Sequence, residues 1–215
     1  MDTKVIQELL EKSRKRRFIQ TVELIVNLKK TYDLNKSENR FVEYIELPRG
    51  KGKKTKIAAV VGPELEKIAK EVFDGVITKD QLKDFGANKR EAKKIANRYY
   101  IFVAQASVMA DLGKFMGKYL STRNKMPNPK FGMIFPDNIT KEGLISIYNR
   151  MQKMVRIVVK NHYTFGIPIG TESMRPEELK ENAEAVINYL FNKIQKDKIK
   201  SIYIKLTMSK SIRIL

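Results

Sequence analysis

The chain has 215 residues, a hydrophobic fraction of 42%, and 43 Lys and Arg against 24 Asp and Glu, which gives a net charge of +19. The length and hydrophobicity indicate one large or two small folded domains, and the charge favours a polyanionic partner, either nucleic acid or an anionic membrane. The absence of cysteine excludes disulfides and thiolate chemistry, and a single histidine, His162, leaves no histidine cluster for a metal, so no metal or cofactor is expected.

The first predicted elements are a helix and an alternating strand. Residues 3–16 have an amphipathic helical pattern that ends in a basic run, 14–17. This run either compensates the helix dipole or binds phosphate. In residues 18–28, FIQTVELIVNL, apolar and polar side chains alternate as in a strand with one buried face. Neither a signal peptide nor an apolar run of ~20 residues is found, so we expect a soluble intracellular protein.

The middle of the chain has the pattern of a parallel α/β unit. A strand at 41–47 is followed by the basic loop 48–56, which lacks the spacing of a nucleotide-binding P-loop. Short apolar runs then alternate with helical segments, as in a Rossmann-like unit, but without its dinucleotide fingerprint. We expect strands at 57–61, 72–77, 99–104 and 132–135, and helices from 64 and at 89–98, 108–119 and 140–151.

The period-two pattern returns after residue 153. Residues 155–159 and 164–169 are expected to be a strand pair, followed by a helix at 176–195 and a closing strand from 201. A lone strand leaves backbone groups unpaired, so we expect the closing strand to pair with 18–28.

The predicted fold class is therefore α/β and α+β in two domains. Residues 1–57 and 156–215 are expected to form a discontinuous α+β sheet domain from both termini. Residues 58–155 are expected to form an inserted, Rossmann-like, three-layer α/β domain.

Several motifs resemble those of the ribosomal protein L1 family in its archaeal form. The most specific is KMPNPK at 125–130; the others are FIQTVE at 18–23, LPRGKG at 47–52, IPIG at 167–170 and Thr207-Met208. The resemblance implies a non-enzymatic, ribosome-associated cytoplasmic protein on the mobile stalk of the large subunit, near the tRNA exit site. The implied partners are large-subunit rRNA, tRNA in the exit site and, for translational repression, the protein's own mRNA. We expect a monomer when free and no membrane contact.

The resemblance also implies an rRNA-binding site at the ends of the first and last strands. A cation can meet phosphate there, an aromatic ring can pack on a ribose or base, and hydroxyls can bind 2′-OH groups. From sequence alone, core packing is the default for Phe18, Met208 could also fill a gap in the core, and Ser201 and Thr207 could simply lie on an outer strand face. The implied rRNA-binding residues are Arg17, Phe18, Thr21, Glu23, Ser201, Tyr203, Thr207, Met208, Ser209 and Ser211.

Four further residues are candidates for secondary RNA contacts: Lys125, Lys130, Lys160 and His162. The prolines around Lys125 and Lys130 favour a preformed loop, which either presents these lysines or is only a rigid turn. His162 is expected in an exposed basic turn, and no paired carboxylate or nucleophile accompanies it, so no catalytic residue is assigned.

The sequence departs from the family pattern at two places. Ser209 stands where the family usually has glycine, and residues 121–123 are Ser-Thr-Arg where it has Gly-Pro-Arg. A Cβ at position 209 could hinder a close backbone approach to RNA unless the serine adds a bond.

Two alternative functions remain open at this stage. One is an α/β enzyme acting on an anionic substrate in a cleft between the domains, which turnover of such a substrate would reveal. The other is a generic basic binder of DNA or membranes, which equal affinity for duplex DNA and folded rRNA would favour.

Overall fold

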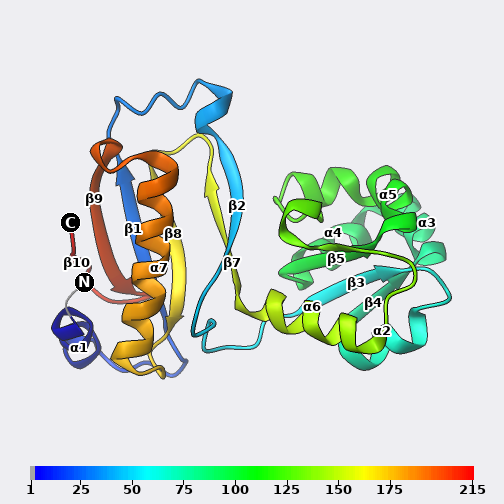
Figure 1. Ribbon diagram of the computed structural model, residues 1–215, viewed down its shortest axis with the longest axis horizontal. Helices are drawn as coiled ribbons and strands as arrows, with labels where there is room; N and C mark the ends of the chain where they lie inside the picture. Colours follow the sequence, from blue (N-terminus) through cyan, green and yellow to red (C-terminus); the bar gives the residue numbers. More distant parts are fainter. Residues whose placement is uncertain (1–2) are drawn as a thin grey trace. The chain divides into compact units, whose positions relative to one another are not determined.

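The computed structural model describes residues 3–215 and divides the chain into two compact units (Figure 1). The first unit, Met1–Lys53 with Lys153–Leu215, holds both ends of the sequence, and the second is Lys54–Gln152. Hydrogen bonds join the two ends of the second unit, at Thr55 and Gln152. Gln152 Oε1 accepts from the backbone N–H of Thr55 at 2.9 Å and from its hydroxyl at 3.1 Å, while Gln152 Nε2 donates to the Thr55 carbonyl at 2.8 Å. These bonds place both residues within the second unit.

The first unit is built on a four-stranded antiparallel sheet in the order β10-β9-β1-β8. The pairing of the first and closing strands is confirmed: Val22 lies opposite Leu206, and Asn27 lies opposite Ser201. The period-two patterns of both strands place their apolar side chains on the same face of the sheet. The strands are β1 (Thr21–Leu28), β8 (Thr164–Thr171), β9 (Ile199–Leu206) and β10 (Ile212–Arg213).

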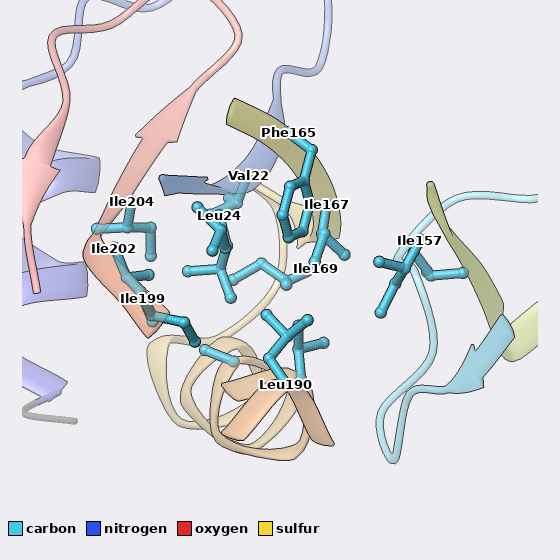
Figure 2. Packing of buried hydrophobic residues seen from close by; sticks show 14 of the residues in the cluster. Val22, Leu24, Ile157, Phe165, Ile167, Ile169, Leu190, Ile199, Ile202 and Ile204 are labelled. Carbon is cyan, nitrogen blue, oxygen red and sulfur yellow. The ribbon is translucent and has the colours of Figure 1, made fainter. Parts of the chain in front are cut away.

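Two helices, α1 (Thr3–Lys12) and α7 (Pro176–Ile194), contribute to the core on one side of this sheet. Figure 2 shows Leu190 of α7 pointing toward Leu24 and the aliphatic side chains of β8 and β9. Burial of these side chains is the main term that stabilises the unit. The opposite face of the sheet carries partly exposed side chains: Thr21, Glu23, Ile25, Tyr203 and Lys205.

A separate two-stranded ladder pairs β2 (Phe41–Glu46) with β7 (Met154–Val159). The expected pairing of the strands near 155–159 and 164–169 with each other is wrong, because β7 pairs with β2 and β8 with β1. Alternation shows that a segment is a strand with a buried face, but it does not identify the neighbouring strand.

The second unit has a parallel sheet in the order β4-β3-β5-β6, which confirms the predicted α/β class. The residues of β3 and β5 are all buried, as expected for central parallel strands. The strands are β3 (Ile57–Val61), β4 (Gly75–Thr78), β5 (Ile101–Gln105) and β6 (Ile134–Phe135). The helices are α2 (Glu66–Val72), α3 (Lys79–Ala87), α4 (Lys89–Arg98), α5 (Met109–Ser121) and α6 (Lys141–Lys153).

Two helices differ from the sequence predictions. Helix α1 ends at Lys12 rather than near residue 16, and Ser13 Oγ donates to the Leu9 carbonyl at its last turn. Helix α3 was not predicted, although Thr78 and Gln81 form a capping box at its start. The basic residues 14–17 therefore lie in an irregular connection and are exposed, rather than completing a helix.

Candidate nucleic-acid interface

The start of β1 and the end of β9 form one corner of the first unit. The Thr21 N–H donates to Thr207 Oγ1 at 3.1 Å, and the Thr207 N–H donates to the Thr21 carbonyl at 3.0 Å. Residues that are 186 positions apart in the sequence are thus held in direct contact. Both lie at the end of a hydrogen-bonded ladder, so their backbone positions are well defined.

Large apolar side chains are exposed at this corner. Phe18, Ile19 and Met208 are 52%, 65% and 58% exposed, although each belongs to a residue type that is usually buried. Their exposure excludes the alternative in which Phe18 and Met208 belong to the core. We call the region formed by Phe18, Ile19, Thr21, Thr207 and Met208 the strand-end surface.

Gln20 fixes the segments that carry this surface. It is only 1% exposed, and its Oε1 accepts from the Met208 N–H at 3.1 Å. Its Nε2 donates to Glu172 Oε2 at 3.1 Å and to the Arg14 carbonyl at 3.3 Å, and its own N–H donates to Glu172 Oε1 at 2.9 Å. Sequence analysis missed Gln20 and Glu172, because their positions in the sequence give no sign that they meet.

The turn after β9 accommodates Ser209 without a glycine-type backbone. Among the described residues other than glycine, a positive φ occurs only at Asn124 and Gln195. Ser209 Oγ accepts from the Leu206 N–H at 2.8 Å, and its own N–H donates to the Leu206 carbonyl at 3.1 Å. The serine side chain therefore adds a bond that stabilises the turn, while Ser211, further along, is exposed.

The remaining predicted strand residues lie along the partly exposed face of the sheet. Glu23 is opposite Lys205, and Tyr203 is opposite Ile25; all four are half-buried. Ser201 is different, since it is 5% exposed and its hydroxyl accepts from Asn27 Nδ2 at 3.0 Å. Ser201 therefore contributes to the hydrogen bonding of the sheet more than to its surface.

Cations surround the strand-end surface. Arg17 and the three basic residues before it are exposed, as is Lys210. Lys53 Nζ donates to Thr21 Oγ1 at 3.0 Å, which brings the basic loop 48–53 to the same corner. An anionic ligand on the strand-end surface would thus lie near several positive charges.

Not every cation of the basic loop is available to a ligand. Arg49 forms a two-bond ion pair with Glu181, at 2.6 and 3.1 Å, and this pair raises the pKa of Arg49 and lowers that of Glu181. Lys51 is 6% exposed, and burial, with a smaller contribution from Lys53, lowers its pKa to about 8. Arg49 therefore holds the loop to α7, and Lys51 is buried.

The four candidates for secondary contacts fall into two groups. Lys160 and His162 are exposed in the turn between β7 and β8 of the first unit. In the second unit Lys130 is exposed, with Nζ 5.5 Å from the centre of the Phe131 ring. Lys125 instead donates through Nζ to the Ala96 carbonyl at 2.7 Å and the Tyr99 carbonyl at 2.6 Å, at the C-terminal end of α4.

We predict that Lys125→Met destabilises the second unit by about 2 kcal/mol, because it removes two charge-assisted hydrogen bonds from carbonyls at a helix end. The measurement is amide hydrogen exchange of peptides from α4 and the 122–130 loop, with Lys130→Met as the matched control. Equal protection in the two variants would contradict this structural role of Lys125.

Over residues 3–215, no group of three or more His, Asp or Glu side chains is arranged to hold a metal ion. None of the helices in this range is long and apolar enough to cross a bilayer.

These features define a class: an α/β protein of two units, one of which is assembled from both ends of the sequence and carries a basic corner with exposed apolar side chains. The chain belongs to the ribosomal protein L1p/L10e family, whose sequence model matches residues 9–210. The resemblance inferred from the motifs is thereby confirmed.

Three relatives described as "Large ribosomal subunit protein uL1" are similar over nearly the whole chain. The protein from Nanoarchaeum equitans is 48% identical over 205 residues, 94% of each chain. Those from Thermococcus kodakarensis and Methanothermobacter thermautotrophicus are 39% and 41% identical, over 97% and 98% of this chain and 94% and 96% of their own.

Proposed function

We propose that this chain is a non-enzymatic protein of the large ribosomal subunit that binds large-subunit rRNA through the strand-end surface. Under this proposal the protein is cytoplasmic and is bound to the ribosome at the mobile stalk, near the tRNA exit site. The observation that carries the proposal is the direct contact of Thr21 with Thr207 beside exposed Phe18 and Met208, within a basic rim. The names of the relatives support the ribosomal assignment.

The chemistry of the surface suits a folded RNA. Duplex RNA has a shallow minor groove lined by 2′-hydroxyls, which can bind neutral hydroxyl and backbone groups such as those of Thr21 and Thr207. Phe18 and Met208 offer apolar surface to a ribose or base. The surrounding cations attract phosphates and set the salt dependence, while the neutral centre determines which RNA shape fits.

The proposal gives the two units different tasks. The first unit, assembled from both ends of the sequence, binds rRNA, with Lys160 and His162 as further contacts. The inserted second unit offers Lys130 to rRNA or to tRNA in the exit site. A similar RNA fold in the protein's own mRNA would use the same strand-end surface, so repression and ribosome binding would be mutually exclusive.

The test uses a transcript of the stalk region of the large-subunit rRNA. Phe18→Ala and Thr207→Ala are each expected to weaken binding about tenfold, because each removes a contact at the centre of the surface. Lys36→Ala, at an exposed position in the loop after β1, is expected to change affinity less than about threefold. The measurement is equilibrium binding at several salt concentrations, with duplex DNA of equal length for comparison.

Unchanged affinity in both centre variants would contradict the assignment of this surface. Equal affinity for the transcript and the duplex DNA would mean that the charge alone determines binding. Competition between the rRNA transcript and the leader of the protein's own mRNA tests the repressor role, since both are expected to displace each other.

A further inference from the structure

A second basic surface lies at the other end of the same sheet. It is a groove of about 710 Å³ at the end of β1, bordered by segments of β8 and β9. We call it the tyrosine groove, after Tyr163 and Tyr203, which line it together with Lys29, Lys30 and Lys200. The strand-end surface and this groove are separated by β1 between Thr21 and Asn27, roughly 20 Å at the usual rise of a strand.

The charge of the groove is of one sign. Lys29, Lys30 and Lys200 are all exposed, and none of the described residues that line the groove is acidic. Three lysines on one groove repel one another, and an anion would relieve this repulsion. The charge pattern thus favours a ligand with several phosphates.

The position of Lys200 follows from an irregularity in the sheet. Asn27 is opposite Ser201, but the next residue, Leu28, is opposite Ile199, so Lys200 has no partner in the register. Such a bulge turns a side chain out of the ladder. The Lys29 N–H donates to the Lys198 carbonyl at 2.8 Å, which holds the two strand ends together beside it.

The floor of the groove is a rigid polar row across three strands. Thr164 Oγ1 donates to Asn27 Oδ1 at 2.7 Å, and Asn27 Nδ2 donates to Ser201 Oγ at 3.0 Å. The two tyrosines flank this row. Tyr163 is half-buried beside the core and is fixed through its carbonyl, which accepts from the Leu28 N–H at 2.7 Å, while Tyr203 lies on the partly exposed face of the sheet.

We propose that the tyrosine groove binds unpaired nucleotides of RNA, with bases against the rings of Tyr163 and Tyr203 and phosphates at Lys29, Lys30 and Lys200. A cationic groove combined with aromatic side chains is the arrangement that binds single-stranded nucleic acid. This inference rests on the proposed function, because the RNA held at the strand-end surface supplies the nucleotides. A ligand that spans both places contacts the protein in two modes: a shaped duplex at one and a single-stranded segment at the other.

The first experiment measures binding of the stalk transcript to variants at Tyr163. Tyr163→Leu is expected to weaken binding about tenfold, because base stacking on an aromatic ring is lost, while Tyr163→Phe, which keeps the ring, is expected to bind within about twofold of the wild type. Lys30→Gln is expected to reduce the slope of log affinity against log salt by about one. Equal losses in Tyr163→Leu and Tyr163→Phe would exclude stacking.

The second experiment locates the RNA. The chain has no cysteine, so Lys30→Cys and Lys210→Cys each provide a unique point for an iron chelate that cleaves nearby RNA. Cleavage from position 30 is expected at unpaired nucleotides that are distinct from those cleaved from position 210. Absence of cleavage from position 30, or cleavage confined to base-paired nucleotides, would overturn the proposal.

The outcomes separate this inference from the proposed function. If Phe18→Ala weakens binding but Tyr163→Leu and Lys30→Gln do not, the strand-end surface binds RNA and the groove does not. If all of these variants bind like the wild type, the proposed function itself fails. Binding of phosphatidylserine vesicles that is lost in Lys30→Gln, with RNA binding unchanged, would assign the groove to a membrane surface instead.

Discussion

Replacing Asn182 with leucine is expected to lower the free energy of unfolding of the first unit by about 4 kcal/mol. Asn182 is fully buried in α7. Its Oδ1 accepts from the Arg49 N–H at 2.9 Å, and its Nδ2 donates to the carbonyls of Gly50 and Ile169, each at 2.8 Å. Leucine has a similar size but would leave the buried Ile169 carbonyl and two part-buried backbone groups, of Arg49 and Gly50, without this partner, at about 1–3 kcal/mol each.

The measurement is urea unfolding in which hydrogen exchange of peptides reports on each unit separately, because a single optical signal would mix the two units. Asn188→Leu is the matched control, since Asn188 is exposed on the same helix. It is expected to change the free energy of unfolding by less than about 0.5 kcal/mol. Similar stability of the two variants would show that the Asn182 bonds contribute little.

Gln20→Leu is expected to weaken RNA binding about 30-fold and to lower the free energy of unfolding of the first unit by about 3 kcal/mol. The substitution removes the acceptor for the Met208 N–H and the donor to the Arg14 carbonyl and to Glu172. Without these bonds, the segments that carry Phe18 and Met208 are no longer held in place. A loss of about 2 kcal/mol in binding corresponds to the stated change in affinity.

Binding and stability are measured separately to interpret this variant. Affinity for the stalk transcript is determined at a temperature where hydrogen exchange shows the variant to be folded. Gln7→Leu, at an exposed position of α1, is the control and is expected to behave like the wild type in both measurements. Wild-type affinity in Gln20→Leu would show that the position of Met208 does not depend on this side chain.

Much of the fold could be predicted from the sequence, because its periodicity is strong. The alternation in 18–28 and from 201 onward gives each strand one apolar face. Pairing the two strands lets both faces contact a common core, and the two strands do pair. The continuous apolar runs at 57–61 and 99–104 indicated buried parallel strands, and the strands found there, β3 and β5, are buried. The partner of the strand at 155–159 was predicted wrongly, since its pattern fits any neighbour with an apolar face.

The candidate site was less predictable, because its supporting contacts are not local. Gln20 and Glu172 are 152 positions apart, and Arg49 and Asn182 are 133 apart. No sequence period or spacing marks such single polar contacts. The sequence also cannot distinguish a lysine that solvates a surface from one that is buried, such as Lys51, or one that caps a helix, such as Lys125.

The contact of Thr21 with Thr207 determines when the binding surface can exist during protein synthesis. The ribosome makes β1 early, but β9 follows only after the whole inserted unit and α7 have emerged. A nascent or truncated chain that ends before β9 therefore lacks half of the corner, and under the proposed function it would not compete with finished molecules for RNA. If this corner binds rRNA as proposed, the order of the strands along the chain restricts assembly to copies whose translation has passed the closing strand.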